Sequence, residues 1–158
     1  MLLARAPVTA YVALGANLGD AQAMVRKSIT DIEAMAGVQL LRCSSLYRSA
    51  PVDSSGPDYV NAVVAIRTAC TAPELMAGLQ RLEQMALRER PYPNAPRTLD
   101  LDLLLFGAAR IDSATLQVPH PRMWQRAFVL LPLAQIAPQL VSARQLQQVA
   151  DQPCQPIR

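Results

Sequence analysis

The chain has 158 residues, of which 51% are hydrophobic and 17% are charged, and its formal net charge is +3. These values predict one globular domain with a sizeable core and argue against a disordered chain. The small positive charge suits anionic small molecules and is weak evidence for a nucleic-acid partner. No apolar run approaches the roughly 20 residues of a membrane span, so we expect no membrane partner.

Three cysteines stand far apart, at Cys43, Cys70 and Cys154. An odd number at these separations fits reduced thiols in a cytosol better than a disulfide framework or a zinc site. Residues 1–7 carry one arginine and no sustained apolar segment, so we expect no signal peptide. The chain is therefore expected to be cytoplasmic, and a monomer is the expected state.

Hydrophobic periodicity predicts the order strand, helix, strand, strand, helix, strand. These elements are expected at 9–14, 21–36, 38–47, 59–68, 75–86 and 98–106. Asp20 is a natural N-cap for the first helix, and Thr71 with Glu74 forms a capping box for the second. Each helix has one apolar stripe, so both should cover one face of a four-stranded antiparallel sheet. This is an α+β, ferredoxin-like βαββαβ sandwich, with the other sheet face and its loops left for function.

The domain is expected to span the whole chain, 1–158, with a core over about 9–140. The apolar segment 128–133 should return to this core. The tail over 141–158 is a polar, glutamine-rich C-terminal extension, so we expect it at the periphery.

The stretch 98–106 carries the strongest chemical signal. Thr98, Asp100 and Asp102 alternate with leucines before a fully apolar run, which predicts a strand that enters the core from a cleft. The two aspartates point the same way, roughly 6.6 Å apart along the strand. The usual relief for such a pair is a shared divalent cation or two, and oxygen ligands of this kind suit Mg²⁺. A solvated strand face is the alternative.

Two other places hold candidate binding groups. Tyr59 and Asn61 share one face of a strand and could stack on and hydrogen-bond a flat heterocycle, although packing is the commoner role for such a tyrosine. His120 is the only histidine, and it shares a short loop with Arg122 and Arg126, which favours an anion site.

These residues together resemble a known family, the 6-hydroxymethyl-7,8-dihydropterin pyrophosphokinases, over about Tyr11 to Pro138. The most specific part is Pro96-Arg-Thr-Leu-Asp-Leu-Asp102, followed by Leu104 to Gly107 and Val118-Pro-His120. Supporting parts are Gly15-x-Asn-Leu-Gly19, Tyr47-Arg-Ser, Pro57-Asp-Tyr-Val-Asn61 and Arg126-Ala-Phe128.

The resemblance implies an ATP-dependent pyrophosphokinase of folate biosynthesis. Such an enzyme transfers the β,γ-pyrophosphoryl group of ATP to the hydroxymethyl group of 6-hydroxymethyl-7,8-dihydropterin, giving the pterin diphosphate and AMP. Its partners are these two small molecules. Its cofactors are two Mg²⁺ ions, held by the residues that match Asp100 and Asp102.

The resemblance also implies roles for individual residues. The expected catalytic residues are Arg88, Arg97, Asp100 and Asp102. The expected pterin-binding residues are Ser49, Val52, Tyr59, Asn61 and Phe128. The expected nucleotide-binding residues are Gln80, Glu83, Arg88, Arg90, Arg97, Leu103, Leu116, His120 and Arg126.

The chain departs from the family pattern mainly in the loop expected to act as a lid. Leu87 stands where the family usually has glycine, and the loop over 91–95 is short and lacks an expected tryptophan. Two other functions stay open. An RNA-binding module of the same fold would display several strand aromatics, but this chain has only two Phe and four Tyr. A catalytically dead relative is disfavoured by the intact aspartate pair, the arginines and the histidine.

Overall fold

The computed structural model describes residues 5–51, 56–88 and 99–158. The strands are β1 (Val8–Ala16), β2 (Val38–Cys43), β3 (Tyr47–Ser49), β4 (Tyr59–Thr68), β5 (Leu99–Phe106), β6 (Ile111–Asp112), β7 (Gln117–Val118) and β8 (Cys154–Pro156). The helices are α1 (Ala21–Glu33), α2 (Ala72–Arg88), α3 (Ala127–Ile136) and α4 (Ala143–Gln148), with single 3-10 turns η1 (Met123–Gln125) and η2 (Pro138–Leu140). Within this part of the chain, no helix combines the length and apolarity that a membrane crossing requires.

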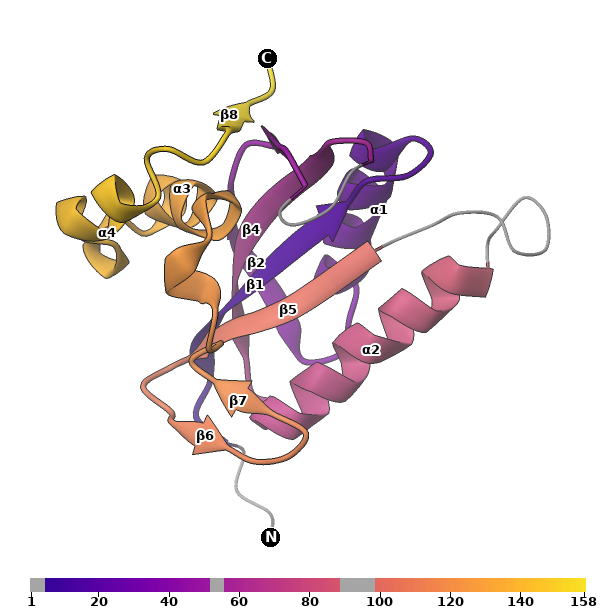
Figure 1. Cartoon of the computed structure of the whole chain (residues 1–158). Coiled ribbons are helices and arrows are strands. Elements are labelled where there is room, and N and C mark those ends of the chain that lie inside the picture. Colours follow the sequence, from indigo (N-terminus) through magenta and orange to yellow (C-terminus); the bar gives the residue numbers. More distant parts are fainter. Residues whose placement is uncertain (1–4, 52–55, 89–98) are drawn as a thin grey trace, which may run out of the picture.

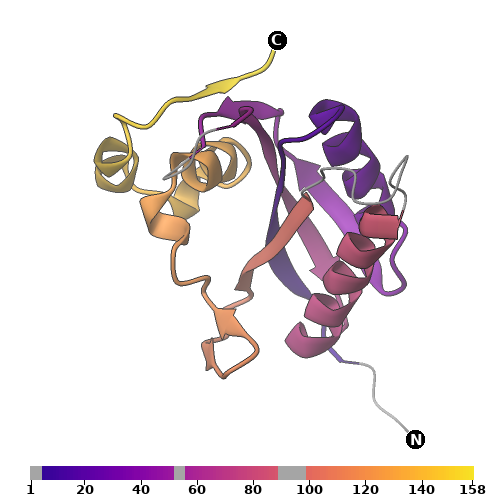
Figure 2. The same cartoon turned by 45° about the vertical axis from the view of Figure 1, so that its right-hand side comes forward.

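A central sheet separates two layers of helices (Figures 1 and 2). Its strands follow the order β5-β1-β4-β3-β8, and β2 pairs with β4 beside β3. All of these pairings are antiparallel. The prediction of an antiparallel sheet with helices is therefore confirmed, although β3 and β8 extend it beyond four strands.

The first layer consists of α1 and α2, as the sequence predicts. Asp20 caps α1 by accepting a hydrogen bond from the Ala23 N–H at 3.0 Å, and the helix buries Val25 and Ile32. It ends at Glu33, about one turn earlier than its apolar pattern suggested. The predicted capping box starts α2. The Thr71 N–H donates to Glu74 Oε1 at 2.8 Å, and the Glu74 N–H donates to Thr71 Oγ1 at 3.2 Å.

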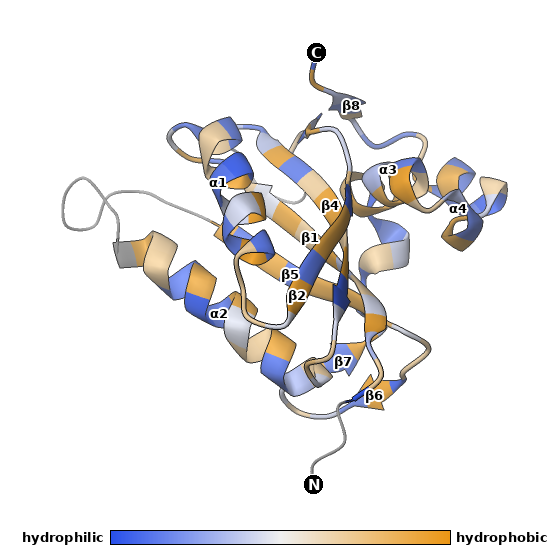
Figure 3. Ribbon diagram, turned by 180° about the vertical axis from the view of Figure 1, so that it is seen from behind, coloured by the Kyte–Doolittle hydropathy of each residue, from blue (hydrophilic) through white to orange (hydrophobic). Residues whose placement is uncertain are grey.

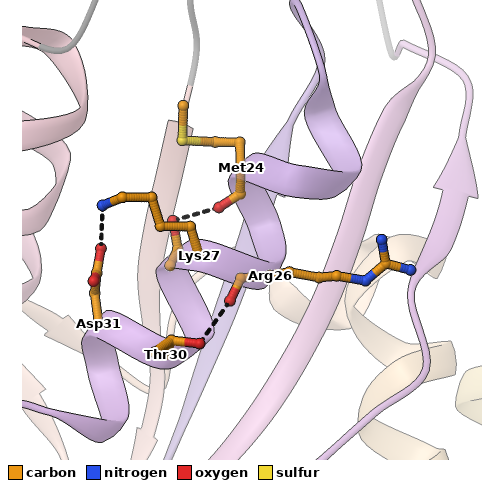
Figure 4. A network of polar contacts seen from close by, with 6 residues as sticks. Met24, Arg26, Lys27, Thr30 and Asp31 are labelled. Carbon is orange, nitrogen blue, oxygen red and sulfur yellow. Dashed lines mark hydrogen bonds and ion pairs between the residues drawn. The ribbon is translucent and has the colours of Figure 1, made fainter.

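The outward side of α1 is polar and carries local contacts along the helix (Figure 4). Lys27 Nζ lies 2.9 Å from the Asp31 carboxylate, one turn along the helix. The Thr30 hydroxyl donates to the Arg26 carbonyl oxygen at 3.3 Å, and the Arg26 side chain points away from these groups. Such exposed pairs contribute only a few tenths of a kcal/mol each. This side of α1 therefore faces solvent, while its apolar stripe packs on the sheet.

The apolar core between these helices and the sheet is continuous. Figure 3 shows hydrophobic residues along the central strands and hydrophilic ones along α1 and α2. Val12, Val64 and Leu101 from three neighbouring strands pack here against Leu75 and other residues of α2. Met85, which belongs to the predicted buried stripe of α2, is instead 47% exposed.

The second layer is formed mainly by α3, and it changes one expectation. The sequence analysis left this whole sheet face for function, but Val63, Ala65 and Leu104 on it are buried under α3. The helix supplies Leu130 and Leu133 to the contact, and both are completely buried. An apolar strand face needs an apolar cover, and the segment 128–133 provides it as a helix that is hydrophobic nearly all round.

The segment expected to be one strand over 38–47 is divided. β2 and β3 both pair with β4, and a register irregularity falls between Leu40 and Arg42. In the gap between β2 and β3, the Ser44 hydroxyl accepts a hydrogen bond from the Val63 N–H at 2.9 Å. This side-chain bond gives the Val63 N–H of β4 a partner where the neighbouring strand is interrupted.

The C-terminal extension is attached to the edge of the sheet. β8 pairs with β3, which places Cys154 opposite Ser49, and the Ile157 N–H donates to the Leu46 carbonyl oxygen at 2.8 Å. Val149 is buried against the α3 layer. The extension thus contributes a strand at the edge of the sheet and core contacts through Val149.

Candidate active site

A cavity of about 330 Å³ opens on the α3 side of the sheet, next to the start of that helix. It is lined by Ala13, Leu14, Gly15, Ser49, Ala50, Tyr59, Asn61, Asp100, Asp102, Arg122, Gln125, Arg126, Phe128 and Gln152. Two carboxylates, three side-chain amides, two aromatic rings and two arginines thus share one space. We call it the first cavity.

β1 contributes Ala13, Leu14 and Gly15 to the lining of the first cavity. In register, Gly15 lies between Asn61 on β4 and Asp100 on β5. A Cβ at Gly15 would lie 3.1 Å from Asn61 Nδ2, tighter than ordinary van der Waals contact. The sequence analysis ended the first strand at residue 14, but Gly15 is a strand residue whose missing side chain leaves room between the amide and the carboxylate.

The two aspartates occupy the same side of β5, as the alternation predicts. Asp100 is exposed and Asp102 is half-buried, and both line the first cavity. The intervening Leu101 points into the opposite core and is buried. In the described residues, no cluster of three or more carboxylate, histidine or cysteine side chains offers a larger set of metal ligands. Two carboxylates leave most of an octahedral shell to water and phosphate, which fits Mg²⁺.

Glu83 connects α2 to this part of β5. Its carboxylate accepts a hydrogen bond from the Leu101 N–H at 2.9 Å. β5 is at the end of the strand order, so its outward N–H groups need partners from elsewhere. Glu83, expected at the nucleotide site, therefore holds the backbone between Asp100 and Asp102. Gln80 is exposed on α2, one turn earlier.

The amide end of the cavity is fixed by a buried hydrogen bond. The Ser49 hydroxyl donates to Asn61 Oδ1 at 2.6 Å, and these residues are only 4% and 3% exposed. The bond occupies the amide oxygen and leaves the amide N–H groups to face the cavity. Tyr59 and Phe128 are half-buried and also line it, so a flat ring here would meet two aromatic side chains and an oriented amide.

Arg126 is held close to one of those aromatic rings. Its guanidinium carbon lies 5.4 Å from the centroid of the Phe128 ring, within the range of a cation–π contact. The residue has an extended backbone between η1 and α3. Arg126 therefore places a positive charge at the rim while Phe128 presents an apolar surface.

A second cavity, of about 390 Å³, also has Asp102 in its lining. It is lined by Met76, Asp102, Leu103, Ser113, Ala114, Thr115, Leu116, Gln117, His120 and Pro121. Most of these residues belong to the hairpin of β6 and β7 and the segment after it. Asp102 faces both cavities, so it is shared between the amide-and-aromatic site and the histidine site.

His120 is oriented by two backbone contacts. Its backbone N–H donates to the Leu104 carbonyl oxygen at 2.9 Å, and its imidazole Nδ1 accepts a hydrogen bond from the Arg122 backbone N–H at 3.2 Å. Burial lowers the pKa of His120; the nearby Asp102 opposes this shift, and Arg126 and Arg122 reinforce it. A neutral imidazole whose Nδ1 accepts must carry its proton on Nε2, which makes Nε2–H a donor.

Most of the chain matches one known protein family. Residues 11–138 match the family described as 7,8-dihydro-6-hydroxymethylpterin-pyrophosphokinase (HPPK). The chain belongs to the HPPK family.

Individual HPPK relatives agree with the family match. The chain is 42% identical over 135 residues to the 2-amino-4-hydroxy-6-hydroxymethyldihydropteridine pyrophosphokinase of Synechocystis sp., covering 85% of this chain and 69% of that one. It is 39% identical over 132 residues to the Bacillus subtilis protein of the same name, covering 83% and 79%. A solved Plasmodium falciparum HPPK-DHPS structure shares the fold, with a TM-score of 0.65 and 12% identity, over 85% of this chain and 42% of that one.

The structure brings together most residues that the HPPK resemblance singled out. The first cavity contains Ser49, Tyr59, Asn61, Asp100, Asp102, Arg126 and Phe128. The second contains Asp102, Leu103, Leu116 and His120. Neither cavity contains Gln80 or Glu83. Val52, Arg90, Arg97 and the side chain of Arg88 lie outside the described residues.

Three polar residues of the first cavity were missed or only partly anticipated. Arg122 was noted only as a neighbour of His120, and its sequence position gave that signal. Gln125 and Gln152 carried none, because their place depends on how η1 and the C-terminal extension pack. Gln152 also lies beyond residue 138, where the match to the HPPK family ends.

Proposed function

We propose that this HPPK-family chain transfers the pyrophosphoryl group of ATP to the hydroxymethyl group of 6-hydroxymethyl-7,8-dihydropterin, in folate biosynthesis. The single observation that carries the proposal is the position of Asp102, which lines both cavities. One cavity offers an amide and two aromatic rings to a flat heterocycle, and the other offers an imidazole to a phosphate chain. The reacting groups of the two substrates would meet at the shared carboxylate.

The proposed step balances as a direct displacement. The hydroxymethyl oxygen forms a bond to the β-phosphorus of ATP, and the bond from that phosphorus to the oxygen bridging to the α-phosphate breaks. The electron pair leaves with AMP, and the hydroxymethyl group loses its proton. Such reactions depend on charge neutralisation and in-line placement more than on a covalent nucleophile.

The residues of the first cavity are proposed to bind and orient the pterin. Tyr59 and Phe128 would hold the ring between them, and Asn61 would donate to its edge through the amide that Ser49 orients. Val52 is proposed to complete this pocket. Asp102 is the candidate acceptor of the hydroxymethyl proton, because it lies where the two cavities meet.

The residues around the second cavity are proposed to bind ATP. His120 would donate through Nε2–H to a phosphate oxygen, with Leu103 and Leu116 lining the nucleotide pocket. Gln80, Glu83 and Arg90 are proposed to contribute to the same site, together with Arg126 at the rim. Arg88 and Arg97 are proposed as catalytic residues, since guanidinium groups suit bidentate phosphate contacts.

Asp100 and Asp102 are the residues proposed to hold magnesium. Their oxygen donors and shared strand side fit this ion, and we propose two ions, as the family resemblance implies. When bound, Mg²⁺ would neutralise phosphate charge and hold phosphate oxygens in place.

Three broader features are proposed with this function. The ferredoxin-like plan is supported by the order β5-β1-β4-β2 with two helices on one face. The whole chain, 1–158, is proposed to act as one pyrophosphokinase domain and as a monomer. A reducing, cytoplasmic location is proposed on the three free cysteines.

The test is AMP formation from ATP and Mg²⁺, with and without 6-hydroxymethyl-7,8-dihydropterin. We expect AMP only when the pterin is present, and its loss in Asp100→Ala. The matched control is Glu33→Gln, which removes one negative charge at the exposed end of α1. A folded protein that binds pterin but forms no AMP would instead support a catalytically dead relative. A protein that binds neither substrate would contradict both.

A further inference from the structure

Gln152 bridges two backbone groups at the wall of the first cavity. Its Oε1 accepts a hydrogen bond from the Ala127 N–H at 2.8 Å, and its Nε2 donates to the Gln125 carbonyl oxygen at 2.8 Å. These two groups flank Arg126 along the chain. One side-chain amide therefore holds both sides of the residue that carries the rim charge.

The bridge replaces a cap that the helix lacks. Arg126 is the N-cap residue of α3, but its side chain makes no capping hydrogen bond. The first N–H groups of a helix have no partner within it, and Ala127 is only 1% exposed, so water has little access to its N–H. Gln152 supplies the missing acceptor from 25 residues further along the chain.

Gln152 is itself held on both sides. Its backbone N–H donates to the Val149 carbonyl oxygen at 3.0 Å, and Val149 is buried in the α3 layer. Two residues later, Cys154 pairs with Ser49, the residue that orients Asn61. The amide is thus fixed between a core contact and a strand that borders the same cavity.

We propose that Gln152 is a positioning residue for the pterin, acting by holding Arg126 and Phe128 as one wall of the first cavity. This inference rests on the proposed function, and it assigns a role to a segment beyond the family match, which ends at residue 138. Its main effect should fall on the pterin, because Phe128 and Gln152 both line the first cavity, whereas ATP would be affected only through Arg126. Among the described residues that line the second cavity, neither Arg126 nor Gln152 is present.

The test compares three variants of the full chain. Gln152→Met keeps the length of the side chain and removes both hydrogen bonds. Gln152→Glu keeps the acceptor for the Ala127 N–H and removes the donor to Gln125. Gln148→Met is the matched control, because Gln148 is exposed at the end of α4 in the same extension.

Two readouts separate positioning from general stability. Steady-state kinetics gives KM for the pterin and for ATP, and amide hydrogen exchange by NMR reports the Ala127 N–H directly. In Gln152→Met we expect KM for the pterin to rise about tenfold and KM for ATP to rise by a clearly smaller factor, through Arg126, because a buried N–H loses its partner. Exchange at Ala127 should become faster. Gln152→Glu should restore protection of Ala127 and part of the pterin KM, and Gln148→Met should match the wild type.

Three outcomes would overturn the inference. One is an unchanged pterin KM in Gln152→Met. Another is a rise of both KM values by the same factor, which would indicate a structural role only. The third is unchanged exchange at Ala127, which would mean that the bridge does not form in solution.

Failure of the proposed function would be recognised separately. In that case the wild type would make no pterin-dependent AMP, and calorimetric binding of 6-hydroxymethylpterin would replace KM as the readout. Weaker binding by Gln152→Met than by wild type would still support the positioning role. Equal binding, or no binding by the wild type, would overturn it.

Discussion

The two faces of the central sheet are covered to different extents. On one face, α1 and α2 enclose a continuous apolar core, with Leu14, Ile66 and Leu101 completely or almost completely buried. On the other face, α3 covers Val63 and Leu104 but stops short of the strand ends beyond them. The uncovered part is the first cavity, so the site exists because one layer of the fold is incomplete.

The change along β5 shows how one strand serves both situations. Asp100, Asp102 and Leu104 follow each other at every second residue on the same side. Leu104 is completely buried under α3, while Asp100 is exposed. Polarity thus changes at the point where the helical cover ends, and the carboxylates stand beside a buried apolar core.

The largest expected effect comes from the uncovered part. Asp102→Asn removes a charge where the two cavities meet, and we expect kcat/KM to fall about 1000-fold, as for loss of other positioned electrostatic groups. Glu33→Gln removes the same charge on the covered side and should leave kcat/KM unchanged. Steady-state AMP formation and urea unfolding of both variants check this. Near-wild-type turnover by Asp102→Asn would show that the shared carboxylate is not needed.

Substitution of two buried leucines compares the helical layers on the two faces of the sheet directly. Leu79 of α2 and Leu130 of α3 are both 0% exposed, so changing either to alanine should lower the free energy of unfolding by about 3 kcal/mol. Only Leu130→Ala should also raise KM for the pterin, because α3 carries Phe128. Urea unfolding and kinetics at low temperature measure the two effects. Equal changes in KM would mean that α3 positions nothing that α2 does not.

The features that depend on local signals could be predicted from the sequence. The alternation at 98–106 gave the side on which Asp100 and Asp102 lie, and Thr71 with Glu74 gave the start of α2, because both patterns act over a few residues. The cover formed by α3 could not be predicted in the same way. An apolar run such as 128–133 fits a helix or a buried strand equally well, and only its partners decide between them.

The residues of the first cavity also differ in whether the sequence could predict them. Tyr59 and Asn61 were expected there because they share a strand side, and they lie there. Gln152 could not be expected, because its contact with Ala127 spans 25 residues and depends on how α4 and β8 dock. Similarly, Glu83 was expected to line a nucleotide pocket, and only the edge position of β5 explains why it accepts the Leu101 N–H.

A smaller effect is expected at the buried hydrogen bond of the cavity. Ser49→Ala leaves Asn61 Oδ1 buried without its 2.6 Å donor, which should cost about 1–2 kcal/mol and raise KM for the pterin about tenfold. Thr30→Ala is the control on the outer side of α1, where an exposed hydroxyl donates at 3.3 Å. It should change neither quantity. If Ser49→Ala binds the pterin as well as the wild type does, the orientation of Asn61 does not matter for recognition.

The smallest effect is expected on the covered side, at the capping box of α2. Two hydrogen bonds from Thr71, first the backbone N–H and then the hydroxyl, lower the pKa of Glu74 below its ordinary value of 4.5. A carboxyl group with a lowered pKa stabilises the folded state above its ordinary pKa, and this contribution is lost as the pH falls through the lowered value. Glu74→Gln should therefore unfold slightly more easily than the wild type at neutral pH, and the difference should disappear in acid. Urea unfolding of both proteins across this range measures it, and a difference that grows as the pH falls would contradict the assigned cause.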